Sequence, residues 1–372
     1  MPIASLVQGR LTEQLRNAVA ADFEISALSF DHAFPPFPHA VRLEGVFLRP
    51  TEVAYDAISA RAAQDGFLIF FRREAGQPVI YAVQAQPPKT AAPPRRAILL
   101  FFLTLISVFI TGGLMWRASP EVETAFDWQA GLSYALPLMT ILLAHELGHF
   151  LVARRNRMAV SPPYFIPLPL IGFGTLGAVI AMLAPPKNRR QLLQMAAAGP
   201  LAGLIFAIPI LIYGLSRSEV GPIPPGPVLM EGNSLFYLGL KWLMFGQILP
   251  SADGIDVSLS IVAFAGWMGL LVTALNLIPA GQLDGGHALF TLFGQRVRPV
   301  TYLLIGLLAA LALITQFWGW LIWAGLLYLF GRVYAVPMDD LTPLDRKHKL
   351  LAAFMLLLFV LLFMPNPLRQ LG

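Results

Sequence analysis

Residues 131–153 read GLSYALPLMTILLAHELGHFLVA, and this stretch decides the fold class. As an α-helix it would be about 34 Å long, enough to cross the ~30 Å hydrocarbon core of a bilayer. Within it, Ala144-His145-Glu146-Leu147-Gly148-His149 places three polar side chains in five residues. An ionisable residue at the middle of a membrane helix costs about 2.5–3.5 kcal/mol even on a lenient scale. These side chains are therefore expected to form a functional site.

The composition of the whole chain agrees with a membrane protein. Of 372 residues, 56% are hydrophobic and 13% are charged, whereas soluble domains carry about 25% charged residues. This excludes a disordered chain, a nucleic-acid binder built on charge, and most soluble enzymes. The chain has no cysteine, so disulfides, thiolate metal sites and a cysteine nucleophile are excluded as well. A metal would have to be held by Asp, Glu or the six histidines.

Further apolar runs predict further membrane spans. With 131–153 they make about six to seven transmembrane helices, and we expect an all-α polytopic membrane domain over residues 97–372. The last three runs are short for a span. The expected spans are 97–116, 131–153, 193–213, 258–278, 300–315, 317–331 and 350–364.

The first 90 residues have a different pattern. We expect a strand at 41–48, a helix at 51–64 and two strands at 66–71 and 78–83. These elements predict a small soluble α+β domain over residues 1–90. A short Pro-rich linker, residues 91–96, would lead into the membrane domain.

The distribution of Lys and Arg predicts the orientation. Apart from Arg117 and Arg217, basic residues fall mainly in the segments that lie inside if the amino-terminal domain is cytoplasmic, which fits the positive-inside rule. The apolar run 235–249, interrupted by Lys241, would invert this pattern as a span, so we expect it at the outer interface or as a re-entrant piece. The inside residues are Arg154, Arg155, Arg157, Lys187, Arg189, Arg190, Arg296, Arg298, Arg332, Arg346, Lys347 and Lys349.

The histidine motif has the spacing of a metal site. His145 and His149 lie four residues apart and share one helix face, so both can reach one ion. Glu146 lies between them and can act on the attacking water. A catalytic zinc needs a third protein ligand. Near a membrane boundary the remaining candidates are Asp284 and His287, in a segment that a helix-breaking Pro279 brings to the same cytoplasmic side.

These two segments together carry a family resemblance. HELGH in a span, followed about 130 residues later by Asn-Leu-Ile-Pro-Ala-Gly-Gln-Leu-Asp-Gly-Gly (276–286), resembles the site-2 protease family of intramembrane zinc metalloproteases. The resemblance covers roughly residues 97–331. Because no PDZ-like insertion is visible between the third and fourth spans, the chain looks most similar to the EGY-type branch and its bacterial relatives. The absence of a plastid transit peptide favours a prokaryotic plasma membrane.

The resemblance implies residue roles and partners. His145, His149 and Asp284 would bind one Zn²⁺ per chain, with Glu146 as the general base and Asn276 as a catalytic group that positions the substrate or the developing oxyanion. Substrates would be transmembrane proteins, cut near the cytoplasmic side of the bilayer, and no nucleic acid is expected. The substrate-binding residues would be Gly174, Thr175 and Gly177.

The segment 164–184 is uncharged and apolar, and the prolines of 161–170 prevent a regular helix. We expect a re-entrant Pro/Gly-rich element there, in which Gly174 to Gly177 offer an extended edge to a substrate strand.

Several rival functions are consistent with parts of the sequence. A metal transporter would also bury His and carboxylates, but would show polar residues on several helices and inverted repeats. A prenyl-protein protease would require a downstream Glu-containing ligand motif. An inactive protease-like scaffold is disfavoured by the intact HELGH. The oligomeric state stays open.

Overall fold

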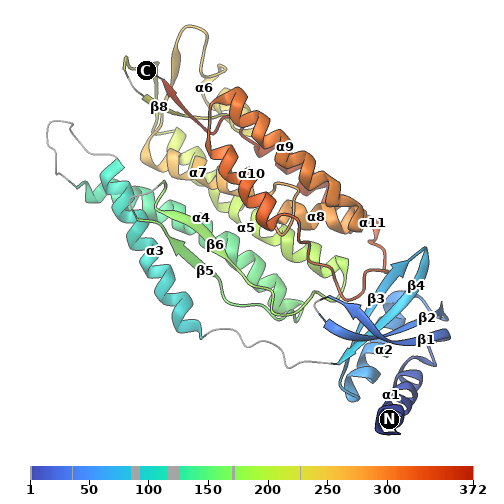
Figure 1. Cartoon of the computed structure of the whole chain (residues 1–372). Coiled ribbons are helices and arrows are strands. Elements are labelled where there is room, and N and C mark those ends of the chain that lie inside the picture. The colour runs from blue at the N-terminus through green and yellow to red at the C-terminus, as the bar shows by residue number, and fades with distance from the viewer. Residues whose placement is uncertain are drawn as a thin grey trace. The chain divides into compact units, whose positions relative to one another are not determined.

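The computed structural model describes residues 2–35, 37–84, 93–115, 126–169, 172–226 and 228–371 (Figure 1). The chain forms two compact units. One contains residues 1–89, 184–192 and 335–345, and the other contains 90–183, 193–334 and 346–372. The residues 85–92, which include part of the expected linker, and Trp116, the expected end of the first span, lie outside the described residues.

The first unit is built on a four-stranded antiparallel sheet, in the order β1-β2-β4-β3. Apolar residues of the strands and helices form its larger core, which includes Leu15, Phe23, Leu43, Ile58 and Phe71. The expected helix 51–64 is present, and so are the three expected strands, with slightly different ends. The elements are α1 (Pro2–Val19), β1 (Phe23–Phe34), β2 (Phe37–Phe47), α2 (Thr51–Gln64), β3 (Phe67–Glu74) and β4 (Gln77–Gln84).

Two segments from later in the chain complete this unit. The edge of β3 is covered by residues 335–345, where Phe71 N donates to Met338 O (2.9 Å) and Asp340 N donates to Phe71 O (3.3 Å). Residues 184–192 pair with that segment in turn, since Met338 N donates to Pro186 O (2.8 Å). Arg72 donates to the carbonyls of Pro337 and Met338, each at 2.9 Å. An edge strand that would otherwise present unpaired amides is thus satisfied.

The second unit is mainly helical. Among the residues that the structure describes, four helical stretches are long and apolar enough to cross a membrane: Pro94–Met115, Trp128–Arg155, Arg189–Leu215 and the run Asp284–Thr315, which contains the helices Asp284–Phe293 and Arg298–Thr315. An α+β domain followed by a helical region is therefore confirmed, while six to seven spans stays a prediction. The helices are α3 (Pro94–Met115), α4 (Trp128–Arg155), α5 (Arg189–Leu215), α6 (Leu235–Phe245), α7 (Ile261–Asn276), α8 (Asp284–Phe293), α9 (Arg298–Thr315), α10 (Gly319–Phe330) and α11 (Arg346–Leu362).

The run 235–249 forms only the 11-residue helix α6, which Gly246 ends in a left-handed conformation. Its Lys241 is fully buried. The ammonium lies 3.3 Å from Asp256 and 3.7 Å from Glu231. Asp256 belongs to β9 (Ile255–Ser258), which pairs with β7 (Glu219–Pro222). Glu231 belongs to β8 (Val228–Glu231), which pairs with β10 (Leu368–Leu371). A buried ion pair network therefore ties α6 to two small sheets.

The proline-rich segment forms a β-hairpin, which agrees with the expectation that its prolines prevent a regular helix. Strand β5 (Tyr164–Pro167) pairs antiparallel with β6 (Thr175–Val179) in a two-stranded sheet. The hairpin lies against α3 and also contacts α4. One edge of β6 has no strand partner among the described residues.

Candidate metal centre

Helix α4 positions the two histidines of the centre. Asp127 caps its start by accepting hydrogen bonds from the amides of Gln129 and Ala130, both at 2.9 Å, which satisfies two of the free donors of a helix end. His145 and His149 lie one turn apart in the second half of the helix, and both side chains are buried.

The third side chain comes from the loop between α7 and α8. Helix α7 ends at Asn276, three residues before Pro279, and Asp284 is the first residue of α8. The chain between α7 and α8 turns so tightly that there is no room for a Cβ atom at Gly285 or Gly286. A Cβ atom at Gly285 would lie 1.9 Å from Leu277 O, and one at Gly286 would lie 2.4 Å from Ala280 O. The two glycines after Asp284 therefore let this loop fold back and hold the carboxylate in place.

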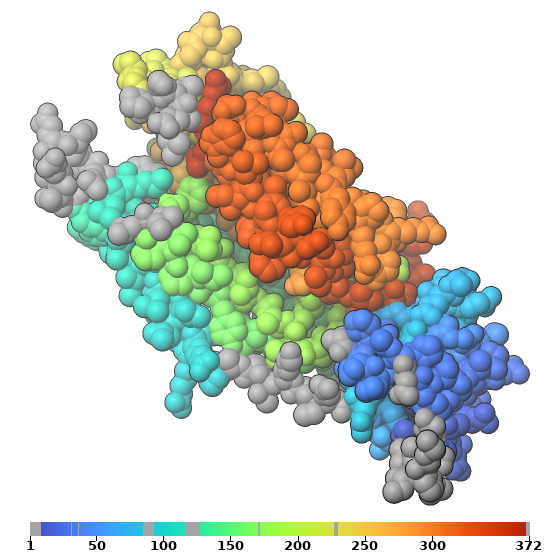
Figure 2. Space-filling model, in the orientation of Figure 1, coloured from blue at the N-terminus to red at the C-terminus, as the bar shows by residue number. Residues whose placement is uncertain are grey.

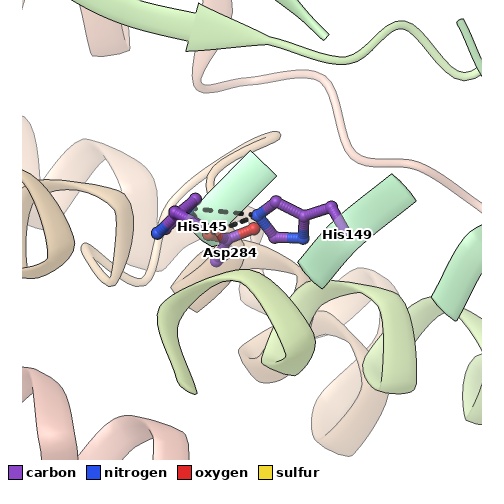
Figure 3. Close-up of side chains that lie close together, drawn as sticks. All are labelled: His145, His149 and Asp284. Atoms are coloured by element: carbon purple, nitrogen blue, oxygen red, sulfur yellow. Dashed lines mark hydrogen bonds and ion pairs between the residues drawn. The ribbon is translucent and has the colours of Figure 1, made fainter. Parts of the chain in front are cut away.

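The three side chains converge on one point (Figure 3). His145 Nε2 and His149 Nε2 are 3.1 Å apart, and Asp284 Oδ2 lies 3.4 Å from the first and 3.3 Å from the second. Ligand atoms bound at 2.0–2.1 Å to a tetrahedral zinc are about 3.3–3.4 Å apart. The geometry of the cluster thus fits a zinc ion with three protein ligands. No other group of three such side chains meets within the described part of the chain.

A hydrogen bond sets the orientation of His149. Its Nδ1 lies 2.8 Å from the carbonyl oxygen of Met195. A carbonyl only accepts, so Nδ1 carries the proton and donates, and Nε2 of the neutral ring keeps its lone pair for a metal. Outer contacts of this kind commonly fix metal-binding histidines. Met195 belongs to α5, which therefore contributes to the site without supplying a ligand.

Two glycines of α5 make room for the histidines, and sequence reasoning missed them. A Cβ atom at Gly199 would lie 2.0 Å from His149 Nε2, and one at Gly203 would lie 3.3 Å from His145 Nδ1. Gly148 of α4 is packed closely against α5 in the same way, because a Cβ atom at Gly148 would lie 2.4 Å from Ala198 O. The spacing of Gly199 and Gly203 could have indicated this contact from the sequence, because small residues four apart allow close helix packing in membranes.

The other predicted site residues reach the centre to different degrees. Asn276 Nδ2 lies 3.5 Å from His145 Nε2, so the end of α7 borders the cluster. Glu146 is buried next to His145 on α4. His287 is buried one turn after Asp284, and its Nδ1 has no hydrogen-bond partner among the residues that the structure describes. It is outside the three-residue cluster.

The predicted substrate-binding residues lie in the β5–β6 hairpin. Gly174 has φ +84° and packs against α3, where its Cβ would be 2.8 Å from Val108 Cα. Its carbonyl accepts a 2.6 Å hydrogen bond from Ser107 Oγ. The Thr175 hydroxyl donates to Ile166 O (2.9 Å) and accepts from Gly177 N (2.9 Å). These contacts fix the hairpin, and no contact with the metal cluster is among them.

Two histidines flank a glutamate on one helix, and a distant aspartate joins them at zinc-ligand spacing. This is the arrangement typical of metallopeptidase centres of the HExxH class. Comparison with known families gives the same class. The family model "Peptidase family M50" matches residues 133–315. Residues 133–315 thus match this family, the site-2 protease family, and the curated relatives named below carry zinc metalloprotease names.

Curated relatives come from plants. The "Probable zinc metalloprotease EGY2, chloroplastic" of Arabidopsis thaliana is 29% identical over 89% of this chain and 61% of its own length. The protein of that name from rice, subspecies indica, is 28% identical over 89% of this chain and 62% of its own. "Probable zinc metalloprotease EGY1, chloroplastic" of Arabidopsis thaliana is 30% identical over 66% and 45%. The chain thus spans about three fifths of the first two relatives. No solved structure is significantly similar.

Proposed function

We propose that the protein is an intramembrane zinc metalloendopeptidase that hydrolyses peptide bonds of transmembrane substrates near the cytoplasmic side of the bilayer. The observation that carries this proposal is the spacing of His145 Nε2, His149 Nε2 and Asp284 Oδ2, at 3.1–3.4 Å, beside the buried Glu146. The three ligands would hold one zinc ion per chain and leave its fourth position open. A transporter would distribute such groups along a path through the membrane, whereas here they meet at one point.

The chain's own residues have separate tasks in hydrolysis. Zinc, when bound, supplies a Lewis acid that polarises the scissile carbonyl and acidifies water. Glu146 takes the proton of the attacking water and later delivers it to the leaving amine. Asn276, at the rim of the cluster, donates from its amide to the substrate carbonyl oxygen as negative charge develops there. The packed helices α4, α5 and α7 exclude bulk water from these steps.

Substrate would bind in an extended form along β6. A helical peptide bond is shielded by its own hydrogen bonds, so a transmembrane substrate has to unwind before cleavage. The unpaired edge of β6, held by Gly174, Thr175 and Gly177, offers backbone groups to an added strand. The lipid bilayer is the second partner of this proposal.

The location of the protein is proposed from its charge pattern. Basic residues at the ends of the apolar helices favour a cytoplasmic amino-terminal domain. The placement in a prokaryotic plasma membrane rests on the sequence alone, and the named relatives are chloroplast proteins.

The test is cleavage of single-span substrates by purified protein in matched liposomes. We expect Glu146→Gln to retain zinc and to lower turnover by at least about 100-fold, the usual contribution of a general base. Glu219→Gln, at an exposed glutamate of β7, is the matched control and should cleave like wild type. Equal turnover by wild type and Glu146→Gln would remove this residue from the mechanism. A fully zinc-loaded wild type that cuts no substrate would instead indicate a scaffold.

A further inference from the structure

The hairpin of α9 and α10 has a basic hollow at its open end. The two helices run antiparallel and are joined by residues 316–318, so the start of α9 and the end of α10 lie together. A hollow of about 420 Å³ opens there, lined by Arg298, Tyr302, Leu329, Arg332 and Val333. The hairpin covers part of the face seen in Figure 2, coloured orange to red-orange. We call this site the α9–α10 hollow.

The charge of the α9–α10 hollow is not neutralised by the protein. No carboxylate forms an ion pair with Arg298 or Arg332 within the part of the chain that the structure describes. The Arg332 guanidinium lies 4.6 Å from the ring centroid of Tyr328, which holds it in place without cancelling its charge. Two cationic groups around one hollow make a site for an anion.

Apolar surface continues from the hollow along both helices. Leu303 and Leu307 of α9 and Ile322 and Leu329 of α10 are 54–68% exposed. Such surface is covered by acyl chains in a membrane, while the arginines stand at its edge, where headgroups lie. The combination fits a ligand with an anionic head and apolar tails better than a free anion.

Residues adjacent in sequence to those that line the hollow contact the loop that carries Asp284. Thr301 Oγ1 donates to Gly331 O (3.2 Å) and lies 2.6 Å from the hydroxyl of Tyr334. Gly331, next to Arg332, is packed against Gly281, whose Cβ would lie 2.4 Å from Gly331 Cα. Gly281 is three residues before Asp284. A ligand that fixes the end of α10 therefore also restrains the loop of the metal centre.

We propose that the α9–α10 hollow binds the phosphate headgroup of one anionic phospholipid of the cytoplasmic leaflet, and that this lipid stabilises the Asp284 loop. The assignment to the cytoplasmic leaflet rests on the membrane orientation given under the proposed function. Binding of the lipid does not depend on whether the protein is a protease. Each arginine near an anionic lipid contributes a factor of roughly five in affinity, so both together contribute roughly 30-fold.

The experiment titrates full-length protein in neutral detergent with dioleoyl phosphatidylglycerol or dioleoyl phosphatidylcholine, and follows bound lipid by native mass spectrometry. We expect wild type to prefer phosphatidylglycerol, and Arg298→Gln/Arg332→Gln to bind it roughly 30-fold more weakly. Arg154→Gln/Arg155→Gln, which removes two exposed arginines at the end of α4, should bind like wild type. An equal loss in this control, or equal binding of both lipids by wild type, would overturn the site.

Two further arms separate the source of the anion and the link to the loop. Inorganic phosphate in excess should not displace the lipid, and displacement would reassign the hollow to a free anion. Hydrogen exchange of residues 277–283 should slow when phosphatidylglycerol is bound in wild type, and not in the double variant. Unchanged exchange on binding would disprove the stabilisation of the loop.

Neither readout uses substrate, so an inactive protease that binds the lipid would still support this inference. If the double variant fails to fold, Arg332→Lys, which keeps the charge, should retain most of the binding.

Discussion

At the scale of single residues, the metal centre depends on a few atoms whose positions are tightly constrained. His149 is held from one side by the Met195 carbonyl and faces Gly199 on the other. Asp284 is held by a loop that only glycines can close. The positions of these two candidate ligands therefore depend on nearby backbone groups, and their roles can be tested by substitution.

Asp284 is expected to be the third zinc ligand. Asp284→Ala should lower zinc content from one per chain to near zero, because two imidazoles alone make an incomplete site. His287→Ala should retain the metal, since His287 lies outside the cluster. Elemental analysis of both purified variants, with His149→Ala as a ligand-loss control, is the measurement. Full zinc in Asp284→Ala together with loss in His287→Ala would transfer the ligand role to His287.

Gly199 is expected to be intolerant of even a methyl group. Gly199→Ala would place Cβ 2.0 Å from His149 Nε2, so the ring must shift and the zinc site should be lost. Gly306→Ala is the matched control, because this glycine lies in α9 with nothing within 4 Å of its Cβ position. Alanine there should retain zinc and gain up to about 1 kcal/mol from helix propensity. Normal zinc content in Gly199→Ala would show that α5 does not confine His149.

At the scale of elements, helix α6 shows how a charged side chain is accommodated in an apolar run. Hydrophobicity alone would make 235–249 a candidate for crossing the membrane. Lys241 instead lies buried between Asp256 and Glu231, and its side chain packs over the ring of Tyr237 at 4.8 Å. The short helix is therefore connected to two small sheets by buried ion pairs. The sequence shows the charged residue in the apolar run, but it does not show which carboxylates pair with it.

This network predicts a large effect of one substitution. Lys241→Met should destabilise the protein by about 3–5 kcal/mol, because Glu231 and Asp256 would remain buried without their cation. Lys347→Met, at an exposed position of α11, should change stability by less than about 0.5 kcal/mol. Denaturant unfolding in detergent, followed by tryptophan fluorescence, compares the two variants. A Lys241→Met protein as stable as wild type would mean that the two carboxylates are protonated or solvated.

At the scale of the whole molecule, the domain organisation is less linear than its sequence suggests. The amino-terminal sheet is completed by residues 184–192 and 335–345, which belong to the same compact unit although they lie far along the chain. Arg190 pairs with Glu52 (3.1 Å) and Lys187 with Asp56 (2.5 Å) inside that unit. A cut at residue 90 therefore removes the partners of two later segments.

Deletion of residues 1–89 is expected to leave zinc binding intact and to lower thermal stability. All three ligands belong to the other unit, whereas residues 337–340 lose the hydrogen bonds of Phe71 and Arg72. Zinc content and the unfolding midpoint of the truncated protein in the same detergent are the two measurements. Loss of zinc while the helical part stays folded would show that the amino-terminal domain supports the metal centre.

The sequence by itself indicated the class of the protein and predicted which residues are candidate metal ligands. The polar motif HELGH in an apolar helix is costly without a function, and helical spacing fixes which side chains share a face. The broken second segment around Pro279 then left Asp284 and His287 as candidates, and the structure brings Asp284 to the cluster. These inferences depend on local periodicity and on the cost of burying charge, both of which a sequence displays.

Tertiary structure alone decided how the parts meet. The fit of Gly199 against His149, the three-membered network of Lys241, and the cover of β3 by residues 335–345 all join segments far apart in the chain. A local pattern cannot specify such pairings, because a glycine or an unpaired strand edge fits many partners of similar energy. Packing of the complete chain selects among them, because close packing and the hydrogen bonds of most buried polar groups have to be met together.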